Sequence, residues 1–378
     1  MSAIYTEKLQ CLLFDELETN ETVQDTIIQK DSKLCNTLEA KELNGYFEIQ
    51  KRRFLGNKYK LLGFIEEIVN ENCGEFKSLC DIFAGTGVVG ERFNKKAIKI
   101  ISNDTLMSNY FALATFLLSK EINLKALEEK IAYLNSIEIV SDNYFSENYG
   151  NRFFTIDNAR KIGYTREEIE RIASSEEERN ALITSLIYAT DKVANTVGHY
   201  DAFRKKLDNI QPIKLLTPKI YTESNENNEV FYEDANALIR KIECDVLYID
   251  PPYNSRHYCD AYHLLENLAR WEKPLLYGKA GKMMRTQLKS IYCLKNAFKA
   301  FDDLIKNAKC RHILVSYNNT GTSKDARSNA RISDNEIVRT LRAKGRVEIF
   351  ERNYKAFTTG KSETNGHTER VFYCNVAK

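Results

Sequence analysis

Short runs of apolar and β-branched residues recur along the chain, and each one stops at a glycine, a proline or a polar cluster. Runs of this length and composition are typical of buried strands. The pattern predicts strands at residues 78–83, 97–102, 229–232, 246–249, 312–317, 346–351 and 370–376. Apolar residues at helical spacing predict helices near residues 61–69, 106–134, 167–173, 176–193, 262–271 and 290–308. Because strands and helices alternate in the first and last thirds, we expect an α/β fold with an open sheet.

Residues 140–225 interrupt this alternation. Amide, basic and aromatic side chains gather there, and these side chains contact phosphates and base edges in DNA complexes. The candidates for DNA contact in this region are Arg152, Asn195, His199 and Tyr200. The alternative interpretation is a solvated helical insertion whose aromatic residues belong to the core.

Length and cysteine usage limit the class of protein. With 378 residues the chain is long enough for two structural units. Its start lacks a secretory signal, and no apolar run approaches the ~18 residues that span a bilayer, so we expect a cytoplasmic protein with no membrane partner. The nine cysteines include no Cys-x-x-Cys pair. We therefore expect reduced, mostly buried thiols and no metal site.

The net charge of +2 conceals an asymmetry between the N-terminal extension and the rest of the chain. Residues 1–48 contain ten acidic residues and four lysines, a net charge of −6, so the remainder carries +8. A modestly basic body suits a polyanionic partner. The acidic extension itself is predicted to be partly helical, and no chemistry is assigned to it.

A glycine-rich turn follows the first strand, in the sequence Ala84-Gly85-Thr86-Gly87-Val88-Val89-Gly90. The order strand, glycine turn, helix lets backbone N–H groups approach a nucleotide-like ligand closely. The next strand ends at Asp104, and an acidic residue at this position can bind the hydroxyl pair of a ribose. NAD and S-adenosylmethionine both carry that ribose, so these residues leave the ligand open.

Lys58 stands just ahead of the helix predicted at 61–69, after a Gly56-Asn57 loop. A lysine in the first turn of a helix is unfavourable for the helix dipole unless an anion lies nearby. The conflict hints at a bound ligand. The plain alternative is an amphipathic helix with a cationic start.

The strand at 246–249 runs directly into Asp250-Pro251-Pro252-Tyr253. Two prolines fix their own φ angles and extend the residue before them, so these four residues predict a stiff, exposed turn at a strand end. The exocyclic amino group of adenine is a poor nucleophile because its lone pair is delocalised into the ring. Acceptors for both amino hydrogens, here the Asp250 carboxylate and the Pro251 carbonyl, would direct that lone pair at a methyl donor. Methylation at cytosine C5 needs a cysteine nucleophile, typically beside a proline, and the chain has no Pro-Cys pair.

With these motifs in this order, the chain resembles the Dam-like DNA adenine-N6 methyltransferases over about residues 52–376. The resemblance implies a Rossmann-like, mostly parallel sheet with a terminal antiparallel strand and a mainly helical target-recognition insertion. It divides the chain into a catalytic domain (49–139 and 226–378) and a target-recognition region (140–225), while the extension (1–48) is a departure that the family pattern does not require. It also implies S-adenosylmethionine as the cofactor. The implied cofactor-binding residues are Phe54, Lys58, Asp81, Phe83, Ala84, Gly85, Thr86, Gly87, Asp104, Asp234, Ala235 and Asp250.

The resemblance assigns catalysis to Asp250, Pro251, Pro252 and Tyr253, with Tyr253 as a surface on which a flipped adenine stacks. Its partner would be double-stranded DNA, and a companion restriction endonuclease would act separately. Further candidates for DNA contact are Arg256, Lys282, Arg285 and Tyr354. A solvated basic face explains Lys282 and Arg285 as well, and the alternative for Arg256 is that it begins the next helix. Two alternatives stay open: a methyltransferase for RNA adenine or a protein amide, and a catalytically silent DNA-binding module.

Overall fold

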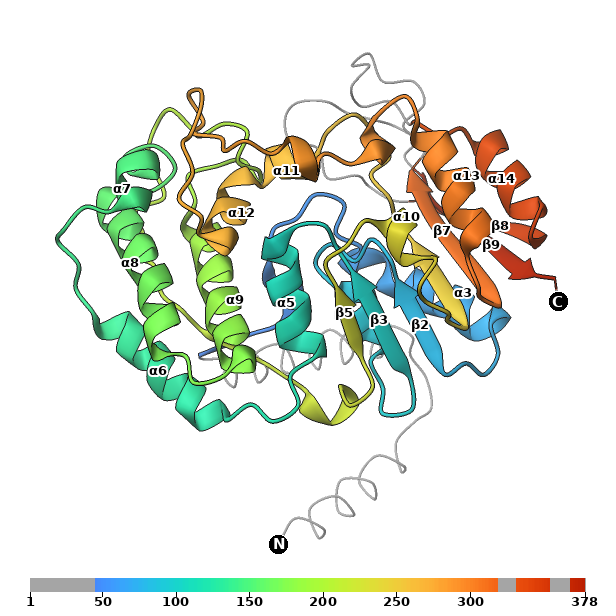
Figure 1. The fold of residues 1–378 in the computed structure, drawn as a ribbon, viewed down its shortest axis with the longest axis horizontal. Helices are drawn as coiled ribbons and strands as arrows, with labels where there is room; N and C mark the ends of the chain where they lie inside the picture. The colour runs from blue at the N-terminus through green and yellow to red at the C-terminus, as the bar shows by residue number, and fades with distance from the viewer. Residues whose placement is uncertain (1–44, 319–330, 354–367, 378) are drawn as a thin grey trace, which may run out of the picture. The chain divides into compact units, whose positions relative to one another are not determined.

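The computed structural model describes residues 45–318, 331–353 and 368–377, and a seven-stranded sheet forms its centre (Figure 1). The strand order is β5-β3-β2-β6-β7-β9-β8. The strands are β2 (Ser78–Asp81), β3 (Lys99–Asn103), β5 (Glu229–Phe231), β6 (Val246–Ile249), β7 (His312–Asn318), β8 (Gly345–Asn353) and β9 (Thr368–Val376). The first five strands in this order are parallel, and β9 is antiparallel to both of its neighbours. This confirms the predicted mostly parallel sheet with a terminal antiparallel strand.

Alternating residues of the central strands pack into two separate cores, one on each face of the sheet. Leu79 and Val246 belong to one core, whereas their neighbours Cys80 and Leu247 belong to the other. All four residues of β6 are buried, because a parallel strand in the middle of such a sheet is covered on both faces. The run of apolar residues at 246–249 is therefore the sequence signature of a central strand.

Helices cover both faces of the sheet (Figure 1). One core receives the buried residues of α3 (Leu62–Asn72), α4 (Val88–Phe93) and α5 (Met107–Leu117). The other receives those of α10 (Ala235–Leu238), α13 (Ala297–Asn307) and α14 (Asp334–Arg342). The result is the three-layer arrangement expected of an open α/β sheet.

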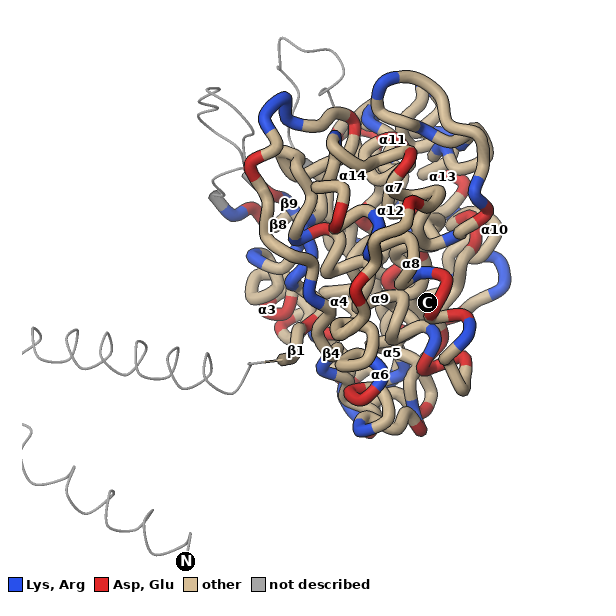
Figure 2. Tube along the Cα trace, turned by 90° about the vertical axis from the view of Figure 1, so that its left-hand side faces the viewer, with Lys and Arg blue, Asp and Glu red and all other residues tan. Residues whose placement is uncertain are grey.

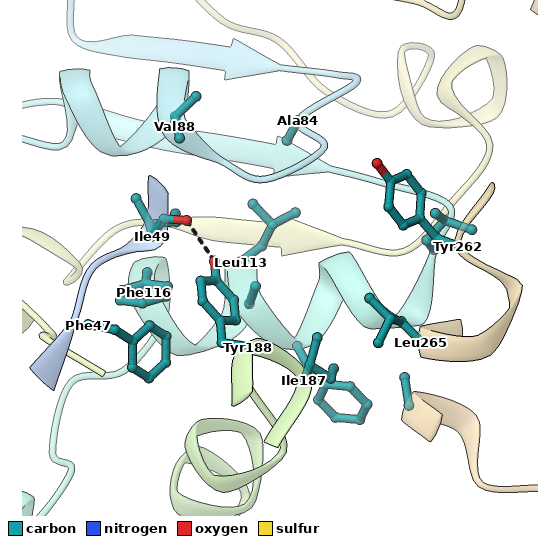
Figure 3. Packing of buried hydrophobic residues seen from close by; sticks show 14 of the residues in the cluster. Phe47, Ile49, Ala84, Val88, Leu113, Phe116, Ile187, Tyr188, Tyr262 and Leu265 are labelled. Atoms are coloured by element: carbon teal, nitrogen blue, oxygen red, sulfur yellow. Dashed lines mark hydrogen bonds between the residues drawn. The ribbon is translucent and has the colours of Figure 1, made fainter. Parts of the chain in front are cut away.

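Further helices extend the first core away from the sheet. They are α6 (Leu124–Ser136), α7 (Tyr144–Tyr149), α8 (Ile156–Ile172), α9 (Glu176–Val193), α11 (Tyr258–Ala261) and α12 (His263–Arg270). Figure 3 shows Tyr188 of α9 close to Phe47 and Phe116, with its hydroxyl donating to the Ile49 carbonyl oxygen at 2.7 Å. The helices of the predicted target-recognition region thus share one continuous core with α5.

The short elements complete the inventory. Two short strands are β1 (Tyr46–Phe47) and β4 (Thr217–Pro218), and the 3₁₀ turns are η1 (Ile49–Lys51), η2 (Tyr59–Leu61), η3 (Thr222–Ser224), η4 (Thr286–Leu288) and η5 (Ile291–Cys293). In the part of the chain that the structure describes, no helix has both the length and the apolar character to cross a membrane. The described cysteines are free thiols and, apart from the half-buried Cys310, all are buried.

Several helix predictions need correction. The helix predicted over 106–134 is two helices, α5 and α6, and Asn123 caps the second by accepting from the Ala126 N–H at 3.1 Å. α8 begins at Ile156 rather than near residue 167, because Thr155 caps it and accepts from the Asn158 N–H at 3.2 Å. α7 was not predicted at all, although Asn143 and Ser146 form a capping box at its start.

Candidate active site

A cavity of about 290 Å³ lies where the strands β2, β3, β5 and β6 end. The carboxyl edge of an open parallel sheet is the usual place for a ligand site. Eleven of the predicted cofactor-binding residues line it, namely Phe54, Lys58, Asp81, Phe83, Ala84, Gly85, Thr86, Asp104, Asp234, Ala235 and Asp250. Motifs spread over about 200 residues of sequence therefore meet at one cavity.

The three glycines of the turn after β2 have different tasks. Gly85 has a φ of +55°, and its N–H donates to the Asp104 carboxylate at 3.0 Å, which joins the ends of β2 and β3. Gly87 has a φ of +84°, and an added Cβ there would meet Leu113 at 2.5 Å. Gly90 lies so close to β3 that a Cβ would meet the Ser102 hydroxyl at 2.9 Å. Only Gly85 lines the cavity, whereas Gly87 and Gly90 permit tight packing.

Among the carboxyl groups that line the cavity, those of Asp81, Asp104 and Asp250 come from the ends of three different strands. Asp81 is 1% exposed, and one of its oxygens is buried without a hydrogen-bond partner among the described residues. Burial, together with the nearby charges of Asp250 and Asp104, raises the pKa of Asp81 despite the opposing charge of Lys58. Burial also raises the pKa of Asp104 to about 6. The hydrogen bonds that its carboxylate accepts from the Leu106 and Gly85 N–H groups oppose this shift. A cavity lined by carboxyl groups, one of which has an oxygen without a hydrogen-bond partner, favours a ligand that carries positive charge and hydrogen-bond donors.

Lys58 finds its anion within the protein. Its ammonium lies 2.7 Å from Asp250 Oδ2 and donates to the Gly56 carbonyl oxygen at 3.1 Å. Burial by itself lowers the pKa of Lys58, but the Asp250 carboxylate outweighs it and holds that pKa well above its ordinary value. The unfavourable position of this lysine at a helix start is thus explained by a contact between two motifs that are far apart in sequence.

The Asp-Pro-Pro-Tyr turn follows β6, as predicted, but it is not exposed. The Asp250 side chain is 16% exposed, Pro251 is buried and Tyr253 is half-buried. The Tyr253 ring makes an edge contact with Tyr317, and its carbonyl oxygen accepts from the Arg331 N–H at 2.9 Å. The neighbouring strand β7 therefore supports the turn. The sequence around one strand does not show which strand lies beside it, so this burial was not predicted. Asp250 and Pro252 line the cavity.

A stack of aromatic rings on one wall of the cavity was missed. The Phe54 ring contacts both Tyr258 and Tyr262, with ring centroids 5.2 and 4.6 Å away. The two tyrosine centroids are 6.3 Å apart, and all three ring planes are nearly parallel. The Leu55 N–H donates to the Tyr262 hydroxyl at 2.7 Å, and the Tyr258 hydroxyl donates to the Leu55 carbonyl oxygen at 3.1 Å. The spacing of the two tyrosines by four residues, one helical turn, was the available signal.

Two further parts of the site were also missed, and the sequence marks them less clearly. Glu266 of α12 is fully buried and accepts from the Met107 and Ser108 N–H groups at the start of α5, each at 3.0 Å. A glutamate inside the apolar stripe of a helix indicates such a buried role. The segment Gln287–Ser290 and Tyr292 also line the cavity, and only the three-dimensional fold brings them there.

The residues predicted to contact DNA lie in different environments. Tyr200 is fully buried, and its hydroxyl donates to Asp191 at 2.9 Å. Asn195 is 1% exposed and donates to the Arg152 and Arg204 carbonyl oxygens. Neither side chain reaches the surface. Arg256 is exposed, and His199 is 22% exposed, 3.7 Å from Asp201.

The other three basic residues predicted to contact DNA hold loops in place. Arg152 donates to the Lys279 carbonyl oxygen at 3.3 Å, Lys282 pairs with Asp201 at 2.5 Å, and Arg285 pairs with Asp260. Lys282 lies within a hairpin beyond α12 at residues 275–284, Arg152 donates to the tip of that hairpin, and Arg285 directly follows it. The last predicted contact, Tyr354, lies outside the described residues.

Comparison with known proteins agrees with this arrangement. The family model for D12 class N6 adenine-specific DNA methyltransferases matches residues 54–332. The Type II methyltransferase M.FokI of Planomicrobium okeanokoites is 35% identical over 85% of this chain and 52% of its own length. Modification methylase LlaI of Lactococcus lactis subsp. lactis is 31% identical over 84% and 53%. The Type II methyltransferase M.NlaIII of Neisseria lactamica is 30% identical over 83% and 95%.

The chain thus spans about half the length of the first two relatives and nearly all of the third. The matched residues 54–332 include the Phe54 and Lys58 segment, the glycine turn and the Asp-Pro-Pro-Tyr turn. The order of these motifs is the one on which the resemblance to adenine methyltransferases depended. The chain belongs to the D12 class N6 adenine-specific DNA methyltransferase family.

Proposed function

We propose that this chain transfers a methyl group from S-adenosylmethionine to the exocyclic amino group of an adenine in double-stranded DNA. The observation that carries the proposal is that Asp250 lines the same cavity as the glycine turn at residues 84–86. An acceptor for an amino group and a loop for a nucleotide-like ligand are thus within reach of each other. Membership in the family supports adenine as the base.

The charges of the cavity support S-adenosylmethionine over a dinucleotide. The carboxyl groups that line it belong to Asp81, Asp104, Glu233, Asp234 and Asp250, and the lysines are Lys58 and Lys289. S-adenosylmethionine carries a sulfonium and an ammonium group, whereas NAD carries a negatively charged pyrophosphate. An excess of carboxyl groups attracts the former and repels the latter.

The residues present would hold this cofactor in a defined way. Asp104 would accept hydrogen bonds from the ribose hydroxyls, and Asp234 and Ala235 would border the adenine of the cofactor. The unpartnered oxygen of Asp81 is available for a donor of the ligand. When bound, S-adenosylmethionine supplies an electrophilic methyl group.

The chain's own part in the chemistry is to hold and orient the amino group of the target. Lys58 contacts Oδ2 of Asp250, which fixes the carboxylate and leaves Oδ1 to accept one amino hydrogen. The Pro251 carbonyl oxygen would accept the other. Two acceptors favour a tetrahedral nitrogen whose lone pair is free to react, and placement of charge and groups accounts for most of the rate.

The target adenine must leave the duplex to reach Asp250. Extrusion costs a few kcal/mol of pairing and stacking. The Tyr253 ring would recover part of this, since stacking of a base on an aromatic ring contributes roughly 1–3 kcal/mol. The edge contact between Tyr253 and Tyr317 supports this role, because it orients the ring before the base arrives.

The names of the relatives indicate the biological setting. M.FokI and M.NlaIII are both named as type II methyltransferases. We infer that this chain is likewise the modification enzyme of a restriction–modification system, with a companion endonuclease that acts separately.

A methylation assay with tritiated S-adenosylmethionine on DNA, RNA and protein substrates tests the proposal. We expect label in DNA adenine. Label only in RNA or protein would refute the DNA assignment. Absence of S-adenosylmethionine binding at micromolar concentration would instead indicate a silent DNA-binding module. Sequencing that detects modified adenines in DNA from expressing cells would then give the recognition sequence.

A further inference from the structure

A hairpin projects beyond α12, and the proposed chemistry does not use it (Figure 1). We define it as residues 275–284. Its two sides meet where the Tyr277 N–H donates to the Lys282 carbonyl oxygen at 2.8 Å and the reverse bond forms at 2.9 Å. Gly278 and Gly281 adopt positive φ angles of 71° and 60° and make the tight tip.

The hairpin divides its apolar side chains between the core and the surface. Leu276 and Ala280 pack against the core, and Met283 is 4% exposed. Their outward counterparts are much more exposed: Leu275 at 80%, Tyr277 at 57% and Met284 at 67%. Single exposed apolar residues are ordinary, but three large ones on one hairpin indicate a surface that is covered in use.

Two hydrogen bonds to backbone carbonyls and one ion pair hold the hairpin in place. The Tyr149 hydroxyl donates to the Gly281 carbonyl oxygen at 3.1 Å, and Arg152 donates to that of Lys279 at 3.3 Å. Lys282 pairs with Asp201 at 2.5 Å. These contacts come from residues of the predicted target-recognition region, so that region supports the hairpin.

The hairpin also leads directly to the cavity. Arg285, the next residue, pairs with Asp260 of α11, the helix that begins with the cavity residue Tyr258. The following segment Gln287–Ser290 lines the cavity itself. The end of the hairpin is therefore only three residues from the wall of the cavity that Asp250 lines.

Charge indicates what covers them. Residues 273–289 contain five basic residues and no acidic one. Ion pairs with Glu167, Asp201 and Asp260 balance three of these, while Lys279 and Lys289 are exposed. Figure 2 shows Lys and Arg segments on the loops around α11. Apolar side chains flanked by lysines suit a nucleic acid duplex, whose phosphates attract the lysines and whose base steps accept apolar wedges.

We propose that the 275–284 hairpin is a wedge that enters duplex DNA beside the target adenine, with Tyr277 as its principal inserted side chain. The inference rests on the proposed methylation of DNA adenine. A flipped base leaves a gap in the stack, and an aromatic or apolar side chain fills it and holds the base out. Lys279 at the tip contacts the backbone phosphates, and Leu275 and Met284 pack against the bases next to the gap.

The test is the Tyr277→Ala variant of the full chain, assayed on a duplex that contains the site found by sequencing. A second duplex carries a mispair at the target adenine, which is already partly unstacked. We expect kcat/KM to fall by about tenfold or more on the paired duplex, as loss of one base–aromatic stack predicts, and by much less on the mispaired duplex. Fluorescence of 2-aminopurine at the target position should decrease in parallel.

Tyr221→Ala is the matched control, because Tyr221 is 52% exposed and lies on the loop before β5. Thermal unfolding and S-adenosylmethionine affinity should be the same for both variants and the wild type. Equal activity of Tyr277→Ala and Tyr221→Ala on the paired duplex would overturn the wedge, as would an equal loss on both duplexes. A change of oligomeric state without a change in methylation would assign the hairpin to a protein partner and overturn it too. If the wild-type chain methylates no DNA, the proposed function itself fails.

Discussion

The cavity at the sheet edge and the helical region 140–225 use the same kinds of side chain for different ends. In the cavity, Asp81, Asp104 and Asp250 come from separate strands and converge on space for a ligand. In the helical region, Phe153 and Tyr200 have no exposed surface, and similar polar residues cap helices. Motifs of fixed spacing at strand ends therefore locate a ligand site. A mixture of amide, basic and aromatic side chains does not distinguish a core from a binding surface.

The largest effect is expected from a substitution in the cavity. Asp250→Ala removes the acceptor for the amino group and should lower kcat by at least about 10²-fold, the scale of losing one group that stabilises a transition state. DNA binding should stay detectable, because the turn is one small part of the contact. Single-turnover methyl transfer and fluorescence anisotropy with labelled duplex measure the two quantities.

Asp157→Ala is the control for that variant, since Asp157 is 85% exposed in the first turn of α8. It should leave methyl transfer unchanged. A stability measurement belongs beside both variants, because Asp250→Ala also leaves the buried Lys58 ammonium without its carboxylate partner. Full turnover by Asp250→Ala would show that the carboxylate has no part in the chemistry.

The next effect concerns the loop that faces the ligand. In Gly85→Val the new residue would keep a φ of +55° and place its Cβ 3.2 Å from the Phe54 ring. Such backbone strain costs about 1–3 kcal/mol. We expect the affinity for S-adenosylmethionine to fall by about 10- to 100-fold, as measured by calorimetry. Gly63→Ala is the control, because a Cβ at Gly63 meets nothing within 4 Å; equal affinities would remove Gly85 from the site.

The sequence predicted those residues of the site that a local pattern marks, but not the contacts between segments far apart in the chain. Lys58, Gly85, Asp104 and Asp250 follow or precede predicted strands and helices, so local patterns found them. The Lys58–Asp250 contact, the ring stack on Phe54 and the buried Glu266 join segments far apart in the chain. Local signals exist for the two tyrosines and for Glu266, but they do not identify the distant partners.

In the fold, too, local patterns were predicted and contacts between distant segments were not. Each strand of the seven-stranded sheet was predicted, because the buried parallel strands are short apolar runs between polar stops. The predicted bounds of the antiparallel strands β8 and β9 are shorter than the nine residues that each contains. The start of α8 was missed, because Asn158 in its first turn resembles a loop residue. Asn158 instead accepts from the Ile213 N–H at 2.8 Å and donates to the Gln211 carbonyl oxygen at 2.8 Å. A buried amide that satisfies a distant backbone segment cannot be told from an exposed one by its identity.

The pH dependence of cofactor binding tests whether Asp104 accepts hydrogen bonds from the ribose of the cofactor. Burial raises the pKa of its carboxyl group to about 6, so it loses its charge as the pH falls through that value. The protonated form is a poorer acceptor for ribose hydroxyls. Affinity for S-adenosylmethionine should therefore be constant above about pH 7 and fall about tenfold by pH 5. The effect on stability has the opposite sign, because a raised carboxyl pKa stabilises the folded state at low pH, and this contribution is lost as the pH rises through about 6.

Calorimetric titrations from pH 5 to pH 8 would measure this dependence. Asp104→Asn is the control variant, since an amide does not titrate in this range and its affinity should be low and independent of pH. An unchanged slope in Asp104→Asn would assign the titration to another group of the cavity, such as Asp81.

The smallest effect concerns the helical region directly. Tyr200→Phe removes one buried hydroxyl and leaves the Asp191 oxygen that accepted from it at 2.9 Å without this donor. We expect the free energy of unfolding to decrease by about 1.5 kcal/mol, the low end for a hydrogen bond to a charged acceptor, because Asp191 still accepts from the Arg53 N–H at 3.0 Å. Because the ring is buried, the affinity for DNA should not change. Tyr221→Phe, at an exposed position, should alter neither quantity. Weaker DNA binding by Tyr200→Phe at unchanged stability would mean that this loop rearranges on the duplex and that Tyr200 contacts DNA after all, which would make the helical region a binding surface rather than a support for one.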